Sequence, residues 1–110
     1  YKNEYSQVLI NIISNARDIL VQRKIQNRYI KISIYEENNN IITIIEDNAG
    51  GIIVEPIEKI FEPFSTYEKR NGTGLGLFMS KLIIQNNMNG KLEATNTENG
   101  AIFKISIPKI

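Results

Sequence analysis

The six residues 72–77, which read GTGLGL, constrain the fold of this chain more than any other stretch. Glycine lacks a Cβ, so it can adopt positive φ angles and let a ligand approach the main chain closely. The apolar segment 76–88 that follows is predicted to be a helix, and a helix N-terminus favours negative charge. A glycine-rich turn leading into a helix therefore predicts a phosphate-binding loop.

The same loop excludes two common nucleotide-binding folds. A Walker-type loop is followed by Lys-Ser or Lys-Thr, and neither pair follows this one. The dinucleotide fingerprint of doubly wound sheets follows a strand with the spacing G-x-G-x-x-G. This loop has the spacing G-x-G-x-G and follows a polar stretch, so it belongs to a different class.

Composition limits the functions that the chain can have. Its 110 residues are enough for one domain with a single core. The formal net charge of +1, without a basic cluster, argues against nucleic acid as a partner. Cysteine is absent, which excludes disulfides and thiolate metal sites and fits a reducing compartment. No apolar run approaches the roughly 20 residues that span a bilayer.

Hydrophobic periodicity predicts two long helices and four strands. The helices cover residues 5–20 and 76–88, and the strands cover 29–35, 41–46, 92–95 and 101–107. An Asn-Asn-Asn turn at 38–40 and a Glu-Asn-Gly turn at 98–100 close two hairpins. This order predicts an α+β fold, a two-layer α/β sandwich whose mixed, mostly antiparallel sheet is covered on one face by helices. Strand 41–46 is nearly all apolar, which predicts that both of its faces are covered.

A polar stripe follows one edge of the first predicted helix and includes Gln7, Asn11, Asn15 and Asp18. The helical period predicts that this stripe borders the core without entering it. Asparagine is unfavourable within a helix because its side chain competes for backbone hydrogen bonds. One interpretation is a solvated edge in an asparagine-rich chain. The other is a Mg²⁺ site, since this ion takes oxygen ligands from one or two protein groups and from substrate phosphates.

Asp47 ends the second predicted strand and precedes Gly50 and Gly51. It either initiates a turn, as aspartate commonly does, or accepts a hydrogen bond from an exocyclic amine such as that of adenine. In the second case the two glycines let a flat ring pass the backbone.

An aromatic pair at Phe61 and Phe64 flanks a proline before the polar segment 65–72. The pair is either an ordinary part of the core or the anchor of a mobile lid. Lys69 and Arg70 in that segment would bring positive charge to phosphates, although a solvated loop has a similar composition.

Segments 7–18, 47–52, 61–64 and 72–77 resemble, in order and spacing, the N, G1, F and G2 boxes of the ATP-binding catalytic domain of sensor histidine kinases. That domain belongs to the superfamily shared with DNA gyrase, the large heat-shock ATPase chaperones and MutL. The resemblance covers nearly the whole chain. It implies the Bergerat fold with an ATP lid over residues 65–71.

The resemblance also implies roles for individual residues. Asn15 is the Mg²⁺ ligand, Asn11 lies alongside the phosphates, and Asp47 binds the adenine amino group. Asn11 and Asn15 are the implied catalytic residues. The implied ATP-binding set is Asn11, Asn15, Asp18, Asp47, Gly51, Ile52, Phe61, Lys69, Arg70, Gly72, Thr73, Gly74, Leu75, Gly76 and Leu77.

The chain departs from the family pattern at two of these segments. Ala49 stands where many members have glycine, and Asp18 stands where many kinases have lysine. Arg17 points away from Asn11 by the helical period, so it is expected to be a surface or interdomain residue.

The implied activity is transfer of the ATP γ-phosphate to a histidine on a separate dimerisation domain of the same protein, upstream of a response regulator. No histidine occurs in the chain, so residues 1–110 are expected to be a fragment that lacks the phosphoacceptor domain and the first strand of the family. The fragment is expected to be monomeric and its parent a homodimer, with this domain in the cytoplasm whether or not the parent is membrane-anchored. Family members that hydrolyse ATP have glutamate at the Asn11 position, so little ATP hydrolysis and no serine kinase activity are expected. The alternative is a degenerate nucleotide-binding or interaction module without kinase activity.

Overall fold

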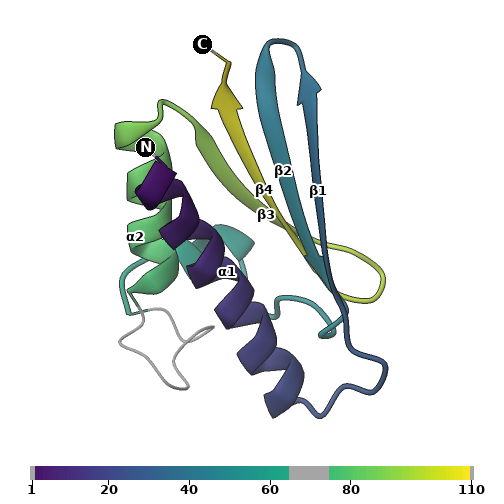
Figure 1. Ribbon diagram of the computed structural model, residues 1–110. Helices are drawn as coiled ribbons and strands as arrows, with labels where there is room; N and C mark the ends of the chain where they lie inside the picture. The colour runs from purple at the N-terminus through teal and green to yellow at the C-terminus, as the bar shows by residue number, and fades with distance from the viewer. Residues whose placement is uncertain (1, 65–74, 110) are drawn as a thin grey trace.

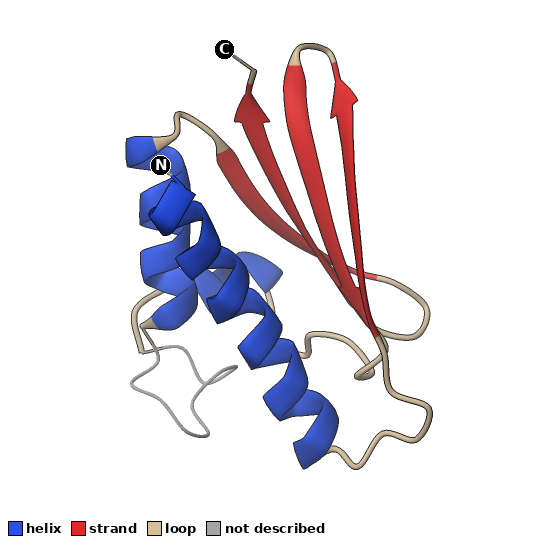
Figure 2. Ribbon diagram, in the orientation of Figure 1, coloured by secondary structure: helices blue, strands red, loops and turns tan. Residues whose placement is uncertain are grey.

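The computed structural model describes residues 2–64 and 75–109, which form two layers. Both helices lie against one face of the sheet, and their axes run side by side (Figure 1, Figure 2). The elements in chain order are helix α1 (Lys2–Gln22), strands β1 (Ile30–Glu37) and β2 (Asn40–Asp47), the 3₁₀ turn η1 (Ile57–Phe61), helix α2 (Gly76–Leu82), the π-helical turn η3 (Ile83–Asn87), and strands β3 (Lys91–Asn96) and β4 (Ala101–Pro108). The predicted two-layer α+β architecture is confirmed.

The described strands form one sheet in the order β1-β2-β4-β3, and every neighbouring pair is antiparallel. The β1–β2 hairpin closes between Glu37 and Asn40, which pair with one another. Asn38 and Asn39 between them have φ angles of 52° and 65°. A two-residue hairpin of this kind needs positive φ at both positions, and asparagine tolerates it better than most residues. The asparagine turn predicted at 38–40 is therefore confirmed.

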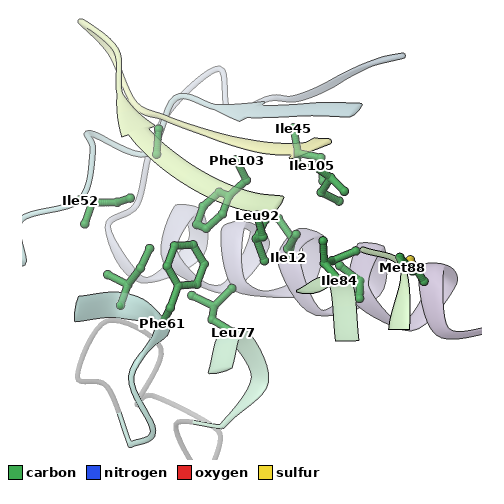
Figure 3. Close-up of a cluster of buried hydrophobic side chains, with 13 residues drawn as sticks. Ile12, Ile45, Ile52, Phe61, Leu77, Ile84, Met88, Leu92, Phe103 and Ile105 are labelled. Carbon is green, nitrogen blue, oxygen red and sulfur yellow. The ribbon is translucent and has the colours of Figure 1, made fainter. Parts of the chain in front are cut away.

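The hydrophobic core lies between the sheet and the two helices (Figure 3). Ile12 of α1 and Ile84 of η3 face Phe103 and Ile105 of β4, and all four are buried. Phe103 also meets the ring of Phe61 edge-on, with the ring centroids 6.3 Å apart. The core thus joins segments from both halves of the chain, which fixes α1 and α2 relative to the ends of the strands.

The prediction that β2 is covered on both faces is wrong, because the helices cover one face only. On the opposite face Ile42 is only 3% exposed and Ile44 is half-buried. Since β2 lies between β1 and β4, the side chains of those neighbouring strands shield it. On the edge strand β1, Ile32 and Ile34 are in register with Ile45 and Thr43 on the helix side, yet they are 47% and 64% exposed.

The second helix is predicted over 76–88, but it is α-helical only from Gly76 to Leu82 and then widens into η3. It stops where predicted, with Asn89 at φ 52° and the amide of Gly90 donating to the carbonyl of Ile84 (2.9 Å). Within the two described ranges, no helix is both long and apolar enough to cross a membrane.

Candidate functional site

Asn11 links the polar stripe of α1 to α2. Its Oδ1 accepts a hydrogen bond from Nε2 of Gln7 (3.0 Å), and its Nδ2 donates to Oγ of Ser80 (3.2 Å). Ser80 is fully buried and lies one turn after Gly76, where α2 begins. The first turn of α2, which follows the predicted phosphate loop in the sequence, therefore lies beside the asparagine stripe.

Asn15 lies one helical turn beyond Asn11 and is only 7% exposed. The prediction that the stripe borders the core without entering it is therefore wrong at this position. Its Nδ2 atom is buried and has no hydrogen-bond partner among the described residues. A buried polar group without a partner costs about 1–3 kcal/mol. A polar ligand that bonded to this buried amide would remove that cost, so Asn15 is a candidate binding residue.

The amide of Asn15 also fits a magnesium–phosphate ligand chemically. The nitrogen and oxygen of a carboxamide can exchange places by rotation, so the group can donate to a phosphate oxygen or coordinate a cation. Among the described residues, no group of three or more histidine, cysteine, aspartate or glutamate side chains could hold a metal. Mg²⁺ usually binds nucleotides through one or two protein oxygens and the oxygens of the phosphates, and a single carboxamide oxygen matches this mode of binding.

Asp18 continues the stripe beyond Asn15 and is more exposed, and its neighbour Arg17 lies outside the stripe. Arg17 is at the surface, as predicted, and its Nη2 lies 3.2 Å from Oδ1 of Asp18. The side chains are 66% and 33% exposed, so this ion pair contributes little to stability.

Asp47 ends β2 as a buried carboxylate with only 2% exposure. Its Oδ1 accepts a hydrogen bond from the main-chain N–H of Ala49 (3.0 Å). Burial raises the pKa of Asp47 above 3.8, and this effect is opposed by hydrogen bonds from the N–H groups of Ala49 and Ala101 and by the charge of Arg23. Such a carboxylate favours any ligand that brings a further hydrogen-bond donor to it.

The turn after Asp47 requires two glycines with positive φ. Gly50 and Gly51 have φ angles of 100° and 97°, which side chains rarely tolerate. The amide of Gly50 donates to the carbonyl of Asn99 in the β3–β4 turn (3.0 Å). The predicted break at this position is confirmed, and Asp47 initiates it through its bond with Ala49.

Several residues that hold this turn were not predicted from the sequence. The side-chain amide of Asn96 bonds to both main-chain groups of Ile52. Its Oδ1 accepts from the N–H of Ile52 (2.7 Å), and its Nδ2 donates to the carbonyl of Ile52 (2.9 Å). Arg23 donates to the carbonyls of Ala49 and Gly51. Gly100 packs directly on the main chain of Asp47. Nothing local in the sequence distinguishes these residues, because each acts on a segment far away along the chain.

The middle of α1 brings these parts together. Ser80 of α2 contacts Asn11, and Ala49 of the turn packs on Ile19 and Leu20 two turns later. Asn15 lies between these two contacts along the helix. The unpaired amide thus has α2 on one side and the glycine turn on the other.

Some of the remaining predicted site residues lie in the described part of the chain and the others do not. Ile52, Phe61 and Leu77 are buried in the hydrophobic core (Figure 3), and Leu75 and Gly76 are half-buried where α2 begins. Lys69, Arg70, Gly72, Thr73 and Gly74 lie outside the described residues.

Asp47 gives the fold a pH dependence of defined sign. Because its pKa is raised above 3.8 on folding, the folded state binds more protons than the unfolded state between these two values. Its contribution to stability is therefore complete below pH 3.8 and is lost as the pH rises through the folded-state pKa. We therefore expect the free energy of unfolding of the wild type, measured relative to that of Asp47→Asn, to decrease as the pH rises through the folded-state pKa. Urea unfolding of both proteins at a series of pH values measures it, and an increase would contradict the burial of the charge.

A family model described as "Histidine kinase-, DNA gyrase B-, and HSP90-like ATPase" matches residues 2–110. The two-component sensor PprA of Pseudomonas aeruginosa is 36% identical over 110 residues, covering 96% of this chain and 12% of that protein. Sporulation kinase A of Bacillus subtilis is 35% identical over 108 residues, covering 98% of this chain and 17% of that protein. The chain therefore spans only 12% and 17% of the length of these two curated relatives.

Solved structures give the same result. The catalytic domain of histidine kinase ThkA matches with a TM-score of 0.81 and 34% identity, over 99% of this chain and 69% of that one. Histidine kinase ThkA in complex with response regulator protein TrrA matches with a TM-score of 0.69 and 31% identity, over 94% of this chain and 28% of that one.

Proposed function

Because the chain belongs to the histidine kinase-, DNA gyrase B- and HSP90-like ATPase family, we propose that it binds Mg²⁺-ATP and delivers the γ-phosphate to a histidine of a separate domain. The relatives include a two-component sensor and a sporulation kinase, and a histidine kinase catalytic domain is among the matching structures. The four segments that resemble the N, G1, F and G2 boxes agree with these matches. The observation that carries the proposal is the unpaired amide of Asn15, which lies between α2 and the turn of Asp47 on the middle of α1.

Each end of the nucleotide has a proposed partner. The oxygen of Asn15 holds Mg²⁺, which neutralises phosphate charge when bound, and Asn11 lies alongside the phosphates. Asp47 accepts a hydrogen bond from the adenine amino group, while Gly51 and Ile52 shape the slot for the ring. Asp18, Phe61, Leu75, Gly76 and Leu77 are proposed to complete the pocket, together with Lys69, Arg70, Gly72, Thr73 and Gly74 outside the described residues.

The proposed reaction requires no nucleophile from this domain. Phosphoryl transfer depends mainly on positioning and on charge neutralisation, and a neutral imidazole attacks without a carboxylate base. None of the 110 residues is histidine, so the acceptor must come from elsewhere. We propose a dimerisation domain of the same protein as its source, a response regulator downstream, and the cytoplasm as the compartment. The match to a histidine kinase in complex with a response regulator supports the response regulator as a partner.

Asn15→Ala tests the magnesium assignment. We expect the affinity for ATP in the presence of Mg²⁺ to fall roughly tenfold or more, because one ligand of the metal is lost. Stability is expected to change by about 1 kcal/mol or less, since removal of an unpaired buried amide offsets the lost packing. Calorimetric titration with ATP, in Mg²⁺ and in EDTA, measures the first effect, and urea unfolding measures the second.

Ser14→Ala is the matched control, because Ser14 is the neighbouring half-buried residue of α1 outside the stripe. Its affinity should equal that of the wild type in both buffers. Wild-type affinity of Asn15→Ala in Mg²⁺ would contradict the metal assignment. A wild-type chain that binds no ATP at all would favour the alternative of an interaction module.

A further inference from the structure

Arg23 follows the last residue of α1, and its side chain reaches the turn after β2. The main chain is fixed there, because Lys24 adopts a left-handed conformation (φ 53°) and the amide of Ile25 donates to the carbonyl of Leu20 (3.1 Å). Nη1 of Arg23 donates to the carbonyl oxygens of Ala49 (2.7 Å) and Gly51 (2.9 Å). A guanidinium Nη nitrogen carries two N–H groups, so this nitrogen is fully used by the turn.

These two carbonyls belong to the residues on either side of Gly50, which has a φ of 100°. A Cβ on Gly50 would be 3.4 Å from the same Nη1 atom, so the guanidinium lies directly against the glycine. Two successive residues with positive φ form a turn that local sequence alone stabilises poorly. The arginine therefore closes the turn from the helix side and holds both carbonyls in one orientation.

We propose that Arg23 is a positioning residue of the adenine site, which fixes the turn at Gly50 and Gly51 against which the base lies and thereby sets the affinity and base selectivity for the nucleotide. This inference rests on the proposed function, because it assigns to Arg23 the task of shaping a site for adenine. It goes beyond that function by placing a determinant of selectivity on a residue outside the four boxes.

The charge of Arg23 acts on the same site. Asp47 is influenced by two nearby charges: Arg23 lowers its pKa and Glu46 raises it, while burial raises it most. Loss of the arginine charge therefore raises the pKa of Asp47 further, so the carboxylate accepts the adenine amino group over a narrower pH range. The shape of the turn and the charge beside Asp47 both change when Arg23 is replaced by a neutral residue.

The turn is also held from the opposite side, so the effect of Arg23 can be separated from folding. Asn96 pairs with both main-chain groups of Ile52, and the carbonyl of Asn99 accepts from the amide of Gly50. Arg23 itself is at the surface. A chain without the guanidinium is therefore expected to fold, with the turn at Gly50 and Gly51 held only by Asn96 and Asn99.

Arg23→Gln and Arg23→Lys test the proposal, with Arg28→Gln as the matched control. Arg28 is an exposed arginine in the following loop, and its Nε donates to the carbonyl of Ile25 (3.0 Å). Calorimetry would measure the affinity of the 110-residue chain for ATP and ITP across a series of pH values. A cooperative thermal unfolding transition shows that each variant is folded. If Arg23→Gln does not fold, the affinity and selectivity of Arg23→Lys decide the proposal.

We expect Arg23→Gln to bind ATP roughly tenfold more weakly, with a smaller preference for ATP over ITP and with the acidic loss of affinity moved to higher pH. Arg23→Lys keeps the charge but loses the planar group, so its affinity should fall without the pH shift. Arg28→Gln should have the same ATP affinity, the same preference for ATP over ITP and the same pH dependence of affinity as the wild type. Wild-type affinity and selectivity in both Arg23 variants would overturn the inference and leave the proposed function intact. A wild-type chain that binds no ATP would overturn both.

Discussion

Replacement of Asp47 by asparagine is expected to lower the affinity for ATP about tenfold to a hundredfold. A hydrogen bond to an ionised buried acceptor contributes about 1.5–3 kcal/mol, and each 1.4 kcal/mol corresponds to a factor of ten. The Asp47 side chain is buried, and its Oδ1 is already bonded to the N–H of Ala49. An amide in its place loses the charge and turns an NH₂ group toward donors.

The same substitution should change base selectivity. The carbonyl oxygen of guanine or hypoxanthine is repelled by a carboxylate, whereas an amide NH₂ can donate to it. We therefore expect the preference for ATP over GTP and ITP to narrow in Asp47→Asn, as measured by calorimetry with each nucleotide.

Glu46→Gln is the control for the lost charge. Glu46 is the adjacent residue of β2, is half-buried, and points to the opposite face of the sheet. Its nucleotide affinities should remain close to those of the wild type. An unchanged ratio of ATP to GTP affinity in Asp47→Asn would contradict the assignment of Asp47 to the base.

Gly100→Ala is expected to destabilise the fold by about 3 kcal/mol or more. A Cβ at this position would be 2.7 Å from the carbonyl carbon of Asp47 and 2.9 Å from Cα of Asn48, and it would overlap the carbonyl oxygen of Asp47. All three atoms belong to the main chain, so no side chain can move aside. Since Ala101 pairs with Asp47 in the sheet, the shift would also displace the carboxylate.

Urea unfolding measures this loss, and calorimetry on the remaining folded protein should show weaker ATP binding. Glu98→Ala is the control, because Glu98 is an exposed residue of the same β3–β4 turn. It should change the free energy of unfolding by less than about 0.5 kcal/mol. A similarly small change in Gly100→Ala would show that the β3–β4 turn does not approach the main chain of Asp47 and Asn48 as closely as described.

Periodicity predicted the helices and strands because each depends on contacts between residues close in sequence. The asparagine hairpin and the stop at Asn89 follow from local patterns of this kind, whereas α1 begins three residues before and ends two residues after the predicted range 5–20. The prediction that both faces of β2 are covered was wrong. An apolar strand can be covered by helices on both faces, or it can be a central strand that is shielded by the side chains of its two neighbours, as β2 is by β1 and β4. The depth of Asn15 was also predicted wrongly, because a helical wheel shows direction and not what packs over it.

The sequence by itself determined the family, the two-layer fold and the candidate residues on the first helix, at the end of the second strand and in the glycine loop, because their residue types and spacing lie within short segments. Only the tertiary structure decided that Asn15 is buried with an unpaired amide, that Asp47 is shielded by a turn, and that Arg23, Asn96 and Gly100 hold that turn. The physical reason is separation along the chain. Arg23 lies 26 and 28 residues before the two carbonyls that it binds, and Asn96 lies 44 residues after its partner. Hydrogen bonds between residues so far apart leave no periodic pattern in the sequence.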